Sequence, residues 1–411
     1  MNKPAVTHQI MDQFSHQAGQ LLVGGKTLDQ IATLLDKEVF YAYDKMVIQA
    51  QIEKFRAYVP HPIKLHFAIK ANPLPALVHY VAPLVDGLDV ASQKELLIAL
   101  QSSMPAEEIS FAGPAKGEQE IRAAIVAGVT LNIESELELE RAVKAGQLLN
   151  LLPRIAFRVN PAFELKASGM KMAGGAKQFG IDEERLIEML PELDYSEIDF
   201  QGFHIFCGSQ NLKPEALTEA HTQTFALAEK LVGLCPVPVK SINLGGGFGI
   251  PYFAGERRLD LSPIGENLKS LLGGTPIDLD TTELVMELGR YLVAEAGVYA
   301  CKVTDIKPSR GQTFVMTNGG LHHHLSNSGN FGQVIRKNYP VAIGNKLDQD
   351  ASVQVNVAGP LCTPLDSLAD RVWLPQTEVG DWFVVYQSGA YGATASPQDF
   401  LGHPHVAEIL L

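Results

Sequence analysis

The sequence has few cysteines, no long apolar run and no signal-like N-terminus. Its four cysteines lie far apart and form no CxxC pair, which argues against a disulfide framework and favours a reducing, cytoplasmic compartment. No apolar stretch approaches the roughly 20 residues needed to span a bilayer. The first 19 residues lack the apolar core of a signal peptide. We therefore expect a soluble protein without a membrane partner.

Positive charge is also scarce. The chain has 33 Lys and Arg residues against 46 Asp and Glu residues, a formal net charge of −13. Nucleic-acid binding needs clustered cations, so this balance and the absence of a basic run argue against such a partner. Apolar residues make up 46% of the 411 residues, which is typical of a globular protein. This length predicts two domains, or one large barrel with an appendage.

From about Lys64 onward, short apolar segments alternate with segments of helical spacing. Eight segments are strand candidates: 65–69, 87–91, 109–113, 131–134, 154–160, 200–206, 241–244 and 283–287. They are apolar almost throughout, as parallel strands covered on both faces are. A doubly wound sheet would alternate in the same way, but the count of eight favours a (β/α)8 TIM-like barrel.

After about Arg290 the pattern changes to strand-like runs separated by Gly, Pro and Ser turns, which predicts a C-terminal antiparallel β-domain. The early strand-like run at 38–44 is a candidate to join it. The expected fold class is α/β. We assign 45–282 to the barrel, and 1–44 together with 283–411 to the β-domain.

In a barrel of this kind, catalytic groups lie just after the strands, at the C-terminal rim. Four strands place polar or glycine-rich clusters there: Lys70, His204, GGGFG at 245–249, and Glu287 with Arg290. A lysine among apolar walls is a better amine nucleophile because desolvation disfavours its charged form. Lys70 could instead extend to solvent.

The other clusters also have two interpretations. Consecutive glycines let backbone N–H groups approach a phosphate, although glycines also make tight turns. Glu287 could hold a proton on a ring nitrogen, so that the ring accepts electrons, or form an ion pair with Arg290. His204 could stack on a planar ring, or be a core histidine.

Three adjacent histidines, His322 to His324, are not spaced as a helical metal pair, and no Cys or Asp pattern accompanies them. We expect no metal site there and leave their role open.

Seven motifs occur in order along the chain: AIKAN, GLDVAS, FHIFCGSQ, NLGGGFG, ELGR, GPLCTPLD and SGAYG. Together they resemble the fold-type III pyridoxal-phosphate decarboxylases, which include ornithine, diaminopimelate and arginine decarboxylases and have an alanine racemase-like fold. The resemblance implies pyridoxal 5'-phosphate as the cofactor. It also implies a homodimer with shared active sites.

The resemblance assigns roles to individual positions. Lys70 matches the Schiff-base lysine, and His204 the histidine stacked on the cofactor ring. Cys362 matches the cysteine that crosses the dimer interface and protonates the intermediate. The remaining cofactor-binding positions are Ser209, Gly245, Gly246, Gly247, Glu287, Gly289, Arg290 and Tyr391. The substrate-binding candidates are Arg290, Arg336, Tyr339 and Asp366.

Two departures concern the substrate. Diaminopimelate decarboxylases carry an acid directly after the cysteine, where this chain has Thr363 and Pro364. Loss of that acid leaves a distal ammonium without its counter-ion. The Arg-Pro-x-x-Tyr stretch that grips the distal carboxylate is altered to Arg336-Lys337-Asn338-Tyr339.

Other stretches, including SGMKMAGGAKQFG at 168–180 and GGLHHHL, resemble a divergent branch of the family. That branch acts on aminoacyl groups tethered to a carrier protein or is associated with exosortase and exopolysaccharide systems.

The sequence thus predicts a carboxy-lyase that decarboxylates an amino acid or a carrier-tethered aminoacyl group through Lys70. Three alternatives stay open: diaminopimelate decarboxylase proper, an amino-acid racemase, and a non-catalytic homologue that binds the cofactor.

Overall fold

The structure is a computed structural model that describes residues 7–164, 170–331, 333 and 336–411. It divides into two compact units. The barrel unit comprises Gln51–Gly249 and Leu259–Tyr291. The β-unit comprises the chain up to Ala50, Ile250–Arg258 and Leu292–Leu411. Each unit is described by itself.

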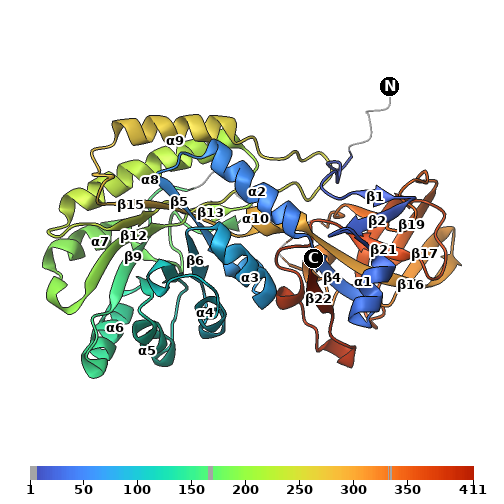
Figure 1. Ribbon diagram of the computed structural model, residues 1–411, viewed down its shortest axis with the longest axis horizontal. Helices are drawn as coiled ribbons and strands as arrows, with labels where there is room; N and C mark the ends of the chain where they lie inside the picture. The colour runs from blue at the N-terminus through green and yellow to red at the C-terminus, as the bar shows by residue number, and fades with distance from the viewer. Residues whose placement is uncertain (1–6, 165–169, 332, 334–335) are drawn as a thin grey trace. The chain divides into compact units, whose positions relative to one another are not determined.

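The barrel unit is built on eight parallel strands that close on themselves (Figure 1). In spatial order they are β9 (Arg154–Asn160), β12 (Asp199–Ile205), β14 (Ser241–Asn243), β15 (Glu283–Leu288), β5 (Ile63–Ala68), β6 (Gly87–Val90), β7 (Ile109–Phe111) and β8 (Thr130–Ile133). Pairing of β8 with β9 completes the ring. The two-residue strand β11 (Ile181–Asp182) pairs in parallel with Val159 and Asn160 at the end of β9. All eight strands predicted from the sequence are therefore confirmed.

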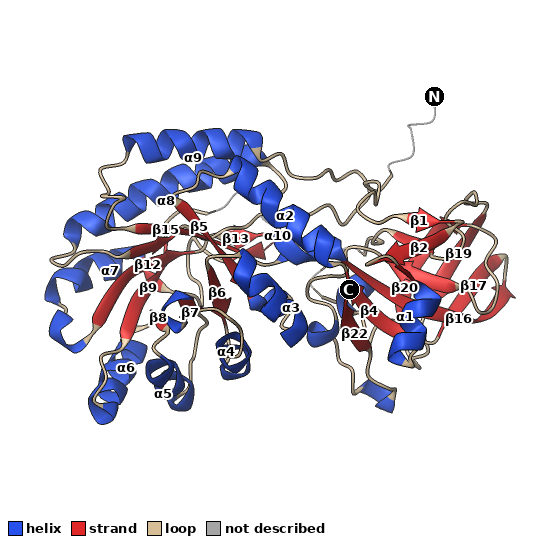
Figure 2. Cartoon of the chain, in the orientation of Figure 1, coloured by secondary structure: helices blue, strands red, loops and turns tan. Residues whose placement is uncertain are grey.

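Helices follow the strands and lie around the barrel (Figure 2). They are α3 (Pro75–Val81), α4 (Gln93–Leu100), α5 (Glu118–Ala127), α6 (Glu136–Leu149), α7 (Glu183–Met189), α8 (Pro214–Leu234) and α9 (Ser262–Gly274), with α2 (Lys45–Tyr58) before the first strand. The short helix α10 (Arg290–Val293) follows the last barrel strand. Local signals fix several of their ends. The Ser92 and Ser135 side chains accept hydrogen bonds from the third residue of α4 and α6, respectively, which satisfies an N–H group that the helix leaves unpaired.

The barrel unit ends beyond the expected boundary at 282. Strand β15 begins at Glu283 and pairs with β14 on one side and β5 on the other. It is the strand that closes the barrel, so the barrel unit extends to Tyr291.

The β-unit is organised around the long strand β16 (Gly297–Ser309), which pairs with β4 (Val39–Tyr43), β17 (Gln312–Thr317) and β21 (Trp382–Val385). The prediction that the run at 38–44 joins this domain is confirmed. The sheet is mixed: most pairs are antiparallel, but β17 pairs in parallel with β19 (Val353–Ala358), as does β22 (Ala407–Leu410) with β4. The α/β class with barrel and separate β-domain is thus confirmed, with two parallel pairs that the sequence did not reveal.

The core of the β-unit includes Phe40, Val298, Ala300, Trp382 and Val384, all buried. The remaining helices and strands of the β-unit are β1 (His16–Gln17), β2 (Gln20–Val23), β3 (Lys26–Thr27), α1 (Leu28–Leu35), α11 (Leu325–Ser328), β18 (Val341–Ile343) and β20 (Ser367–Leu374). Within the described ranges, no helix combines the length and apolar character needed to cross a bilayer.

Candidate active site

Lys70 and Glu287 meet at the C-terminal end of the barrel. Lys70 lies in a short 3-10 turn, Ile69–Ala71, directly after β5, and Glu287 is near the end of the adjacent strand β15. The Lys70 Nζ lies 3.3 Å from the Glu287 Oε1. The lysine side chain is 39% exposed, while that of the glutamate is 4% exposed. An accessible amine is therefore held against a buried carboxylate.

His204 brings a second nitrogen to the same carboxylate. It lies on β12, and its Nε2 is 3.0 Å from the Glu287 Oε2. The ring is buried, and its Nδ1 has no hydrogen-bond partner among the described residues. The sequence-predicted trio of Lys70, His204 and Glu287 is therefore one contiguous cluster.

These neighbours keep Glu287 ionised. Burial alone would raise its pKa, but the charges of Lys70, His204 and Arg158 and the His204 hydrogen bond outweigh burial and hold the pKa below its usual range. A carboxylate that stays charged at neutral pH can hold a proton on a nitrogen that faces it.

The glycine run after β14 approaches this cluster through its backbone. Gly245 has a φ of +72°, a conformation that suits glycine. A Cβ atom on Gly246 would lie 2.0 Å from the Glu287 carbonyl oxygen, so only glycine lets the loop pass so close to β15. The Gly245 carbonyl accepts a hydrogen bond from the Glu287 N–H at 2.9 Å. Gly247 completes the run, also with positive φ.

Three further predicted cofactor-binding residues lie in the barrel unit at or just after strand ends. Gly289 follows β15, where a Cβ would lie 2.9 Å from the Ala68 carbonyl oxygen of β5. This close approach brings the residues after the two strands together. Arg290 begins α10. Ser209 lies in strand β13 (Gly208–Ser209), which pairs with β10 (Met170–Lys171).

The sequence reasoning missed a buried ion pair beside the cluster. Arg158 on β9 is the register partner of His204, and its Nη1 lies 2.9 Å from the Glu134 Oε1. Glu134 also accepts hydrogen bonds from the Gly113 and Gly180 N–H groups. An arginine in the interior of a largely apolar strand was the available signal, because such a charge is buried only when it is paired.

The β-unit holds the other predicted residues. Cys362 and Asp366 lie between β19 and β20. Cys362 is exposed, whereas Asp366 is buried. The two carboxylate oxygens of Asp366 accept hydrogen bonds from the backbone N–H groups of Leu321 and Leu361, at 2.6 and 2.8 Å. Asp366 therefore links the segment at Leu321 to the segment at Leu361 through hydrogen bonds.

Arg336 donates hydrogen bonds to the backbone carbonyls of Ser328 and Ser367, at 3.1 and 2.9 Å. Tyr339 is buried, with its ring centroid 4.6 Å from that of Tyr252. Tyr391 has a φ of +52°, and its carbonyl accepts a hydrogen bond from the Ser326 hydroxyl.

The three adjacent histidines are buried in the β-unit. Burial and the neighbouring His323 and His403 lower the pKa of His322 to about 3. No set of His, Cys, Asp and Glu side chains in the described part of the chain is arranged to hold a metal ion. Of the divergent stretch at 168–180, Ser168 and Gly169 lie outside the described residues.

Comparisons with known proteins agree with this geometry. Residues 45–294 match the family model for the pyridoxal-binding domain of the pyridoxal-dependent decarboxylases. The chain is 35% identical to the L-glutamyl-[BtrI acyl-carrier protein] decarboxylase of Niallia circulans, over 90% of this chain and 88% of that protein. It is 30% identical to the 2-[(L-alanin-3-ylcarbamoyl)methyl]-2-hydroxybutanedioate decarboxylase of Staphylococcus aureus, over 90% and 93% of the two chains.

A solved relative is the diaminopimelate decarboxylase of Helicobacter pylori complexed with L-lysine. It superposes with a TM-score of 0.81 at 25% identity, over 93% of this chain and 94% of that one. This chain belongs to the pyridoxal-dependent decarboxylase family, whose fold-type III architecture it shares. It is a carboxy-lyase that uses pyridoxal 5'-phosphate.

The site fits that cofactor. It offers an accessible lysine amine, an ionised glutamate 3.3 Å from that amine, and a buried imidazole whose Nδ1 has no hydrogen-bond partner among the described residues. The glycine run supplies backbone in a conformation that a side chain would obstruct.

Proposed function

We propose that this decarboxylase acts on an aminoacyl group tethered to a carrier protein, with L-glutamyl the first candidate. The observation that carries the proposal is that the Asp366 carboxylate is already hydrogen-bonded to the backbone through both oxygens. Residues 360–366 contain this single acid, and both its carboxylate oxygens are used by backbone N–H groups. The loop therefore offers no carboxylate for the distal ammonium of a diamino acid, and burying that charge unpaired would be costly.

The other end of a diaminopimelate-like substrate also lacks its expected partner. The Arg336 guanidinium is engaged by two backbone carbonyls, which supports a structural role. A carrier-bound substrate has a thioester and a phosphopantetheine arm in place of a distal ammonium, and the neutral Thr363 and Pro364 suit it. The 35% identical relative from Niallia circulans, whose name specifies an L-glutamyl carrier-protein substrate, supports the same assignment.

In the proposed mechanism, Lys70 is the residue that attaches the cofactor. Pyridoxal phosphate, when bound, supplies an aldehyde for the amine and a ring that accepts the electrons of the breaking bond. Ser209, Gly245, Gly246, Gly247, Gly289, Arg290 and Tyr391 are the proposed remaining binding residues. The glycine backbone N–H groups and the Arg290 guanidinium suit a phosphate.

Glu287 and His204 orient and polarise the site. The ionised Glu287 carboxylate can hold a proton on a facing ring nitrogen, and His204 is fixed by its bond to Glu287, so its ring can pack on a flat cofactor. Cys362 is the proposed acid that returns a proton to the substrate carbon after CO2 is lost.

We further propose that the enzyme is a cytoplasmic homodimer with shared active sites, in which each copy contributes Cys362 to its partner. The exposure of Cys362 supports this. The free state of all four cysteines is compatible with a reducing compartment.

A CO2-release assay tests the substrate. The holoenzyme is offered an acyl-carrier protein loaded with L-glutamate, beside free glutamate, lysine, ornithine, arginine and diaminopimelate. We expect CO2 from the loaded carrier at a kcat/KM at least about 100-fold above any free amino acid, since carrier contacts contribute binding energy. Equal or faster turnover of diaminopimelate would refute the proposal. Inverted amino acid without CO2 would instead indicate a racemase, and cofactor binding without turnover a non-catalytic homologue.

A further inference from the structure

A polar cavity of about 450 Å³ opens at the N-terminal end of the barrel. Its wall includes the first residues of β9 and β15, the end opposite to Lys70. Glu283 and Glu287 are four residues apart on β15, a separation of about 13 Å along a strand. The cavity is therefore distinct from the candidate active site.

One side of the cavity rim carries an excess of positive charge. Arg154 on β9 and Lys240, just before β14, both pair with Asp199 on β12. Two cations thus share one carboxylate. The Arg154 Nε is buried and has no described hydrogen-bond partner. These three side chains leave one positive charge in excess. Glu107 also lines the cavity, and its backbone carbonyl accepts a hydrogen bond from the Arg154 Nη2 at 3.4 Å.

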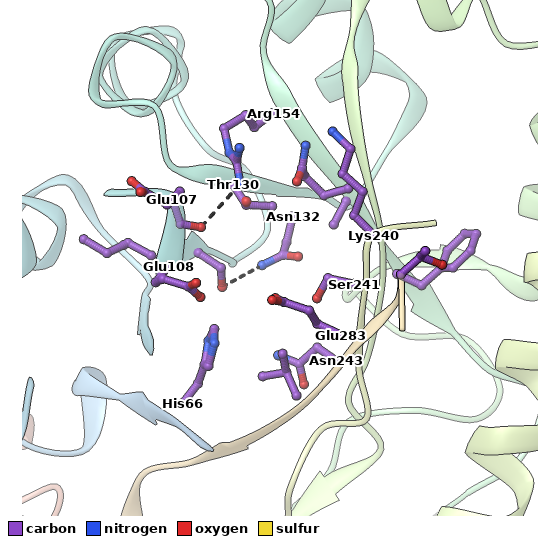
Figure 3. Close-up of a pocket in the computed structure, with 17 residues that line it drawn as sticks. His66, Glu107, Glu108, Thr130, Asn132, Arg154, Lys240, Ser241, Asn243 and Glu283 are labelled. Carbon is purple, nitrogen blue, oxygen red and sulfur yellow. Dashed lines mark hydrogen bonds between the residues drawn. The ribbon is translucent and has the colours of Figure 1, made fainter. Parts of the chain in front are cut away.

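The other side has the reverse arrangement. Glu108, just before β7, and Glu283 on β15 both pair with Lys64 on β5, at 3.0 and 2.7 Å. Burial lowers the pKa of Lys64, but the two carboxylates raise it further, so the lysine stays charged. Two carboxylates share one cation, and one unit of negative charge remains. Figure 3 shows Arg154 and Lys240 across the cavity from Glu108 and His66.

The inner end of the cavity presents a buried polar group that lacks a partner. The His66 side chain is 9% exposed and lines the cavity, with its Nδ1 3.3 Å from the Asp89 Oδ1. Its Nε2 has no hydrogen-bond partner in the described part of the chain. Buried nitrogens of this kind are almost always hydrogen-bonded, so this atom points to a polar ligand. Asn132 and Asn243 line the same region.

We propose that this cavity binds a free zwitterionic amino acid. The side with Arg154 and Lys240 is complementary to an α-carboxylate. The side with Glu108 and Glu283 is complementary to an α-ammonium. The His66 Nε2 would form a hydrogen bond with a polar atom of the ligand. A simple anion would be attracted to the first side and repelled by the second, and a simple amine the reverse. The volume lies within the range of about 300–1,000 Å³ typical of small-molecule pockets. This second site goes beyond the proposed decarboxylation of a carrier-tethered group and does not depend on the identity of that substrate.

Calorimetric titration of the holoenzyme tests the site. The probes are glycine and L-glutamate, each with the cofactor's visible absorbance recorded in parallel to report binding near Lys70. N-acetylglycine, which lacks the ammonium, and ethylamine, which lacks the carboxylate, are the half-ligand controls. We expect saturable binding of at least one amino acid that leaves the absorbance unchanged, with each half-ligand at least about tenfold weaker.

Two variants and two matched controls locate the binding. Lys240→Met and Glu283→Gln should each weaken the amino acid at least about tenfold. Lys230→Met and Glu136→Gln remove equally exposed paired charges elsewhere on the barrel and should leave its affinity unchanged. The proposal is overturned by any of three results: no binding up to ~10 mM, equal binding of a half-ligand, or equal loss in the control variants. Binding that tracks a cofactor absorbance change would place the ligand at Lys70 and also overturn it.

Discussion

The Lys70 ammonium and the Glu287 carboxylate lie 3.3 Å apart at the ends of two parallel strands that are hydrogen-bonded to each other. Strand closure of the barrel creates this contact, since β5 is the first barrel strand and β15 the last. A residue near position 70 can therefore meet one near 287 without a dedicated loop. The same carboxylate holds His204 through its second oxygen, so Glu287 organises both nitrogens of the candidate site.

The first prediction concerns cofactor attachment. Lys70→Ala removes the amine that we propose joins the cofactor, so the visible absorbance of lysine-bound pyridoxal phosphate should disappear and CO2 release should fall below detection. Lys230→Ala, on the outside of α8, is the control and should retain both. An unchanged absorbance in Lys70→Ala would remove Lys70 from this role.

The second prediction concerns the charge of Glu287. Glu287→Gln keeps the side-chain shape but removes the carboxylate, and kcat should fall at least about 100-fold. Because the native pKa is below its usual value, the wild-type carboxylate is charged above pH 4.5 and loses its charge only as the pH falls toward that lowered value. The fold-loss in kcat of Glu287→Gln relative to the wild type should therefore be constant from about pH 5 to 9.

Rate measurements across that pH range check this expectation, with Glu136→Gln as the control for loss of a surface carboxylate. A deficit that vanishes at the acid end would mean that Glu287 already titrates there, contrary to its position between Lys70 and His204.

The third prediction concerns the glycine run. In Gly246→Ala the new methyl would lie 2.0 Å from the Glu287 carbonyl oxygen, and backbone cannot yield as a flexible side chain does. We expect weaker cofactor binding and a loss of about 1–3 kcal/mol in unfolding free energy. Gly233→Ala on α8 meets nothing within 4 Å and should be stabilising by about 0.5–1 kcal/mol. Equilibrium denaturation and cofactor titration distinguish the two.

The barrel was predictable because each strand is a short apolar run bounded by turn residues. Helix ends were less predictable. Gly128 ends α5 in the left-handed conformation, which is a usual role of glycine after the last residue of a helix. The glycine at position 146 does not end α6, which continues to Leu149 and closes at Asn150. Gly146 is needed for its size, since a Cβ there would lie 2.7 Å from the Leu151 carbonyl oxygen, and size requirements are invisible in one sequence.

The candidate site likewise has residues that were predictable from the sequence and residues that were not. Lys70, His204 and Glu287 stand out as polar residues at the ends of apolar strands. Arg158 and Asp89 lie inside strands. The partner of Asp89, His66, lies on the neighbouring strand β5, and the partner of Arg158, Glu134, directly follows the neighbouring strand β8. Such pairs depend on the register between strands, which follows from closure of the ring and not from local pattern.

The fourth prediction concerns the buried pair of His66 and Asp89. Burial lowers the pKa of His66, but Asp89 raises it above its ordinary value of 6.5. The pair therefore stabilises the fold fully below pH 6.5, and the stabilisation is lost as the pH rises through the raised native pKa. Asp89→Asn should cost about 3 kcal/mol at low pH, and the difference should shrink at higher pH.

Urea denaturation at about pH 5.5 and about pH 9 measures how the destabilisation by Asp89→Asn changes with pH. Ser110→Ala is the matched control, because Ser110 donates to the same Asp89 oxygen but leaves the ion pair intact. Its cost should be independent of pH. A pH-independent cost for Asp89→Asn would show that His66 is neutral in the native protein.

The fifth prediction concerns Cys362, the exposed member of the four cysteines. Burial raises the pKa of Cys235 to about 11 and that of Cys207 to about 12, so neither thiol gives up its proton readily. If Cys362 returns the proton after CO2 loss, Cys362→Ala should lower kcat about 100-fold while the cofactor absorbance stays unchanged. Cys235→Ala should retain full activity. A Cys362→Ala enzyme with wild-type kcat would require another proton donor, because the alanine side chain has no proton to transfer.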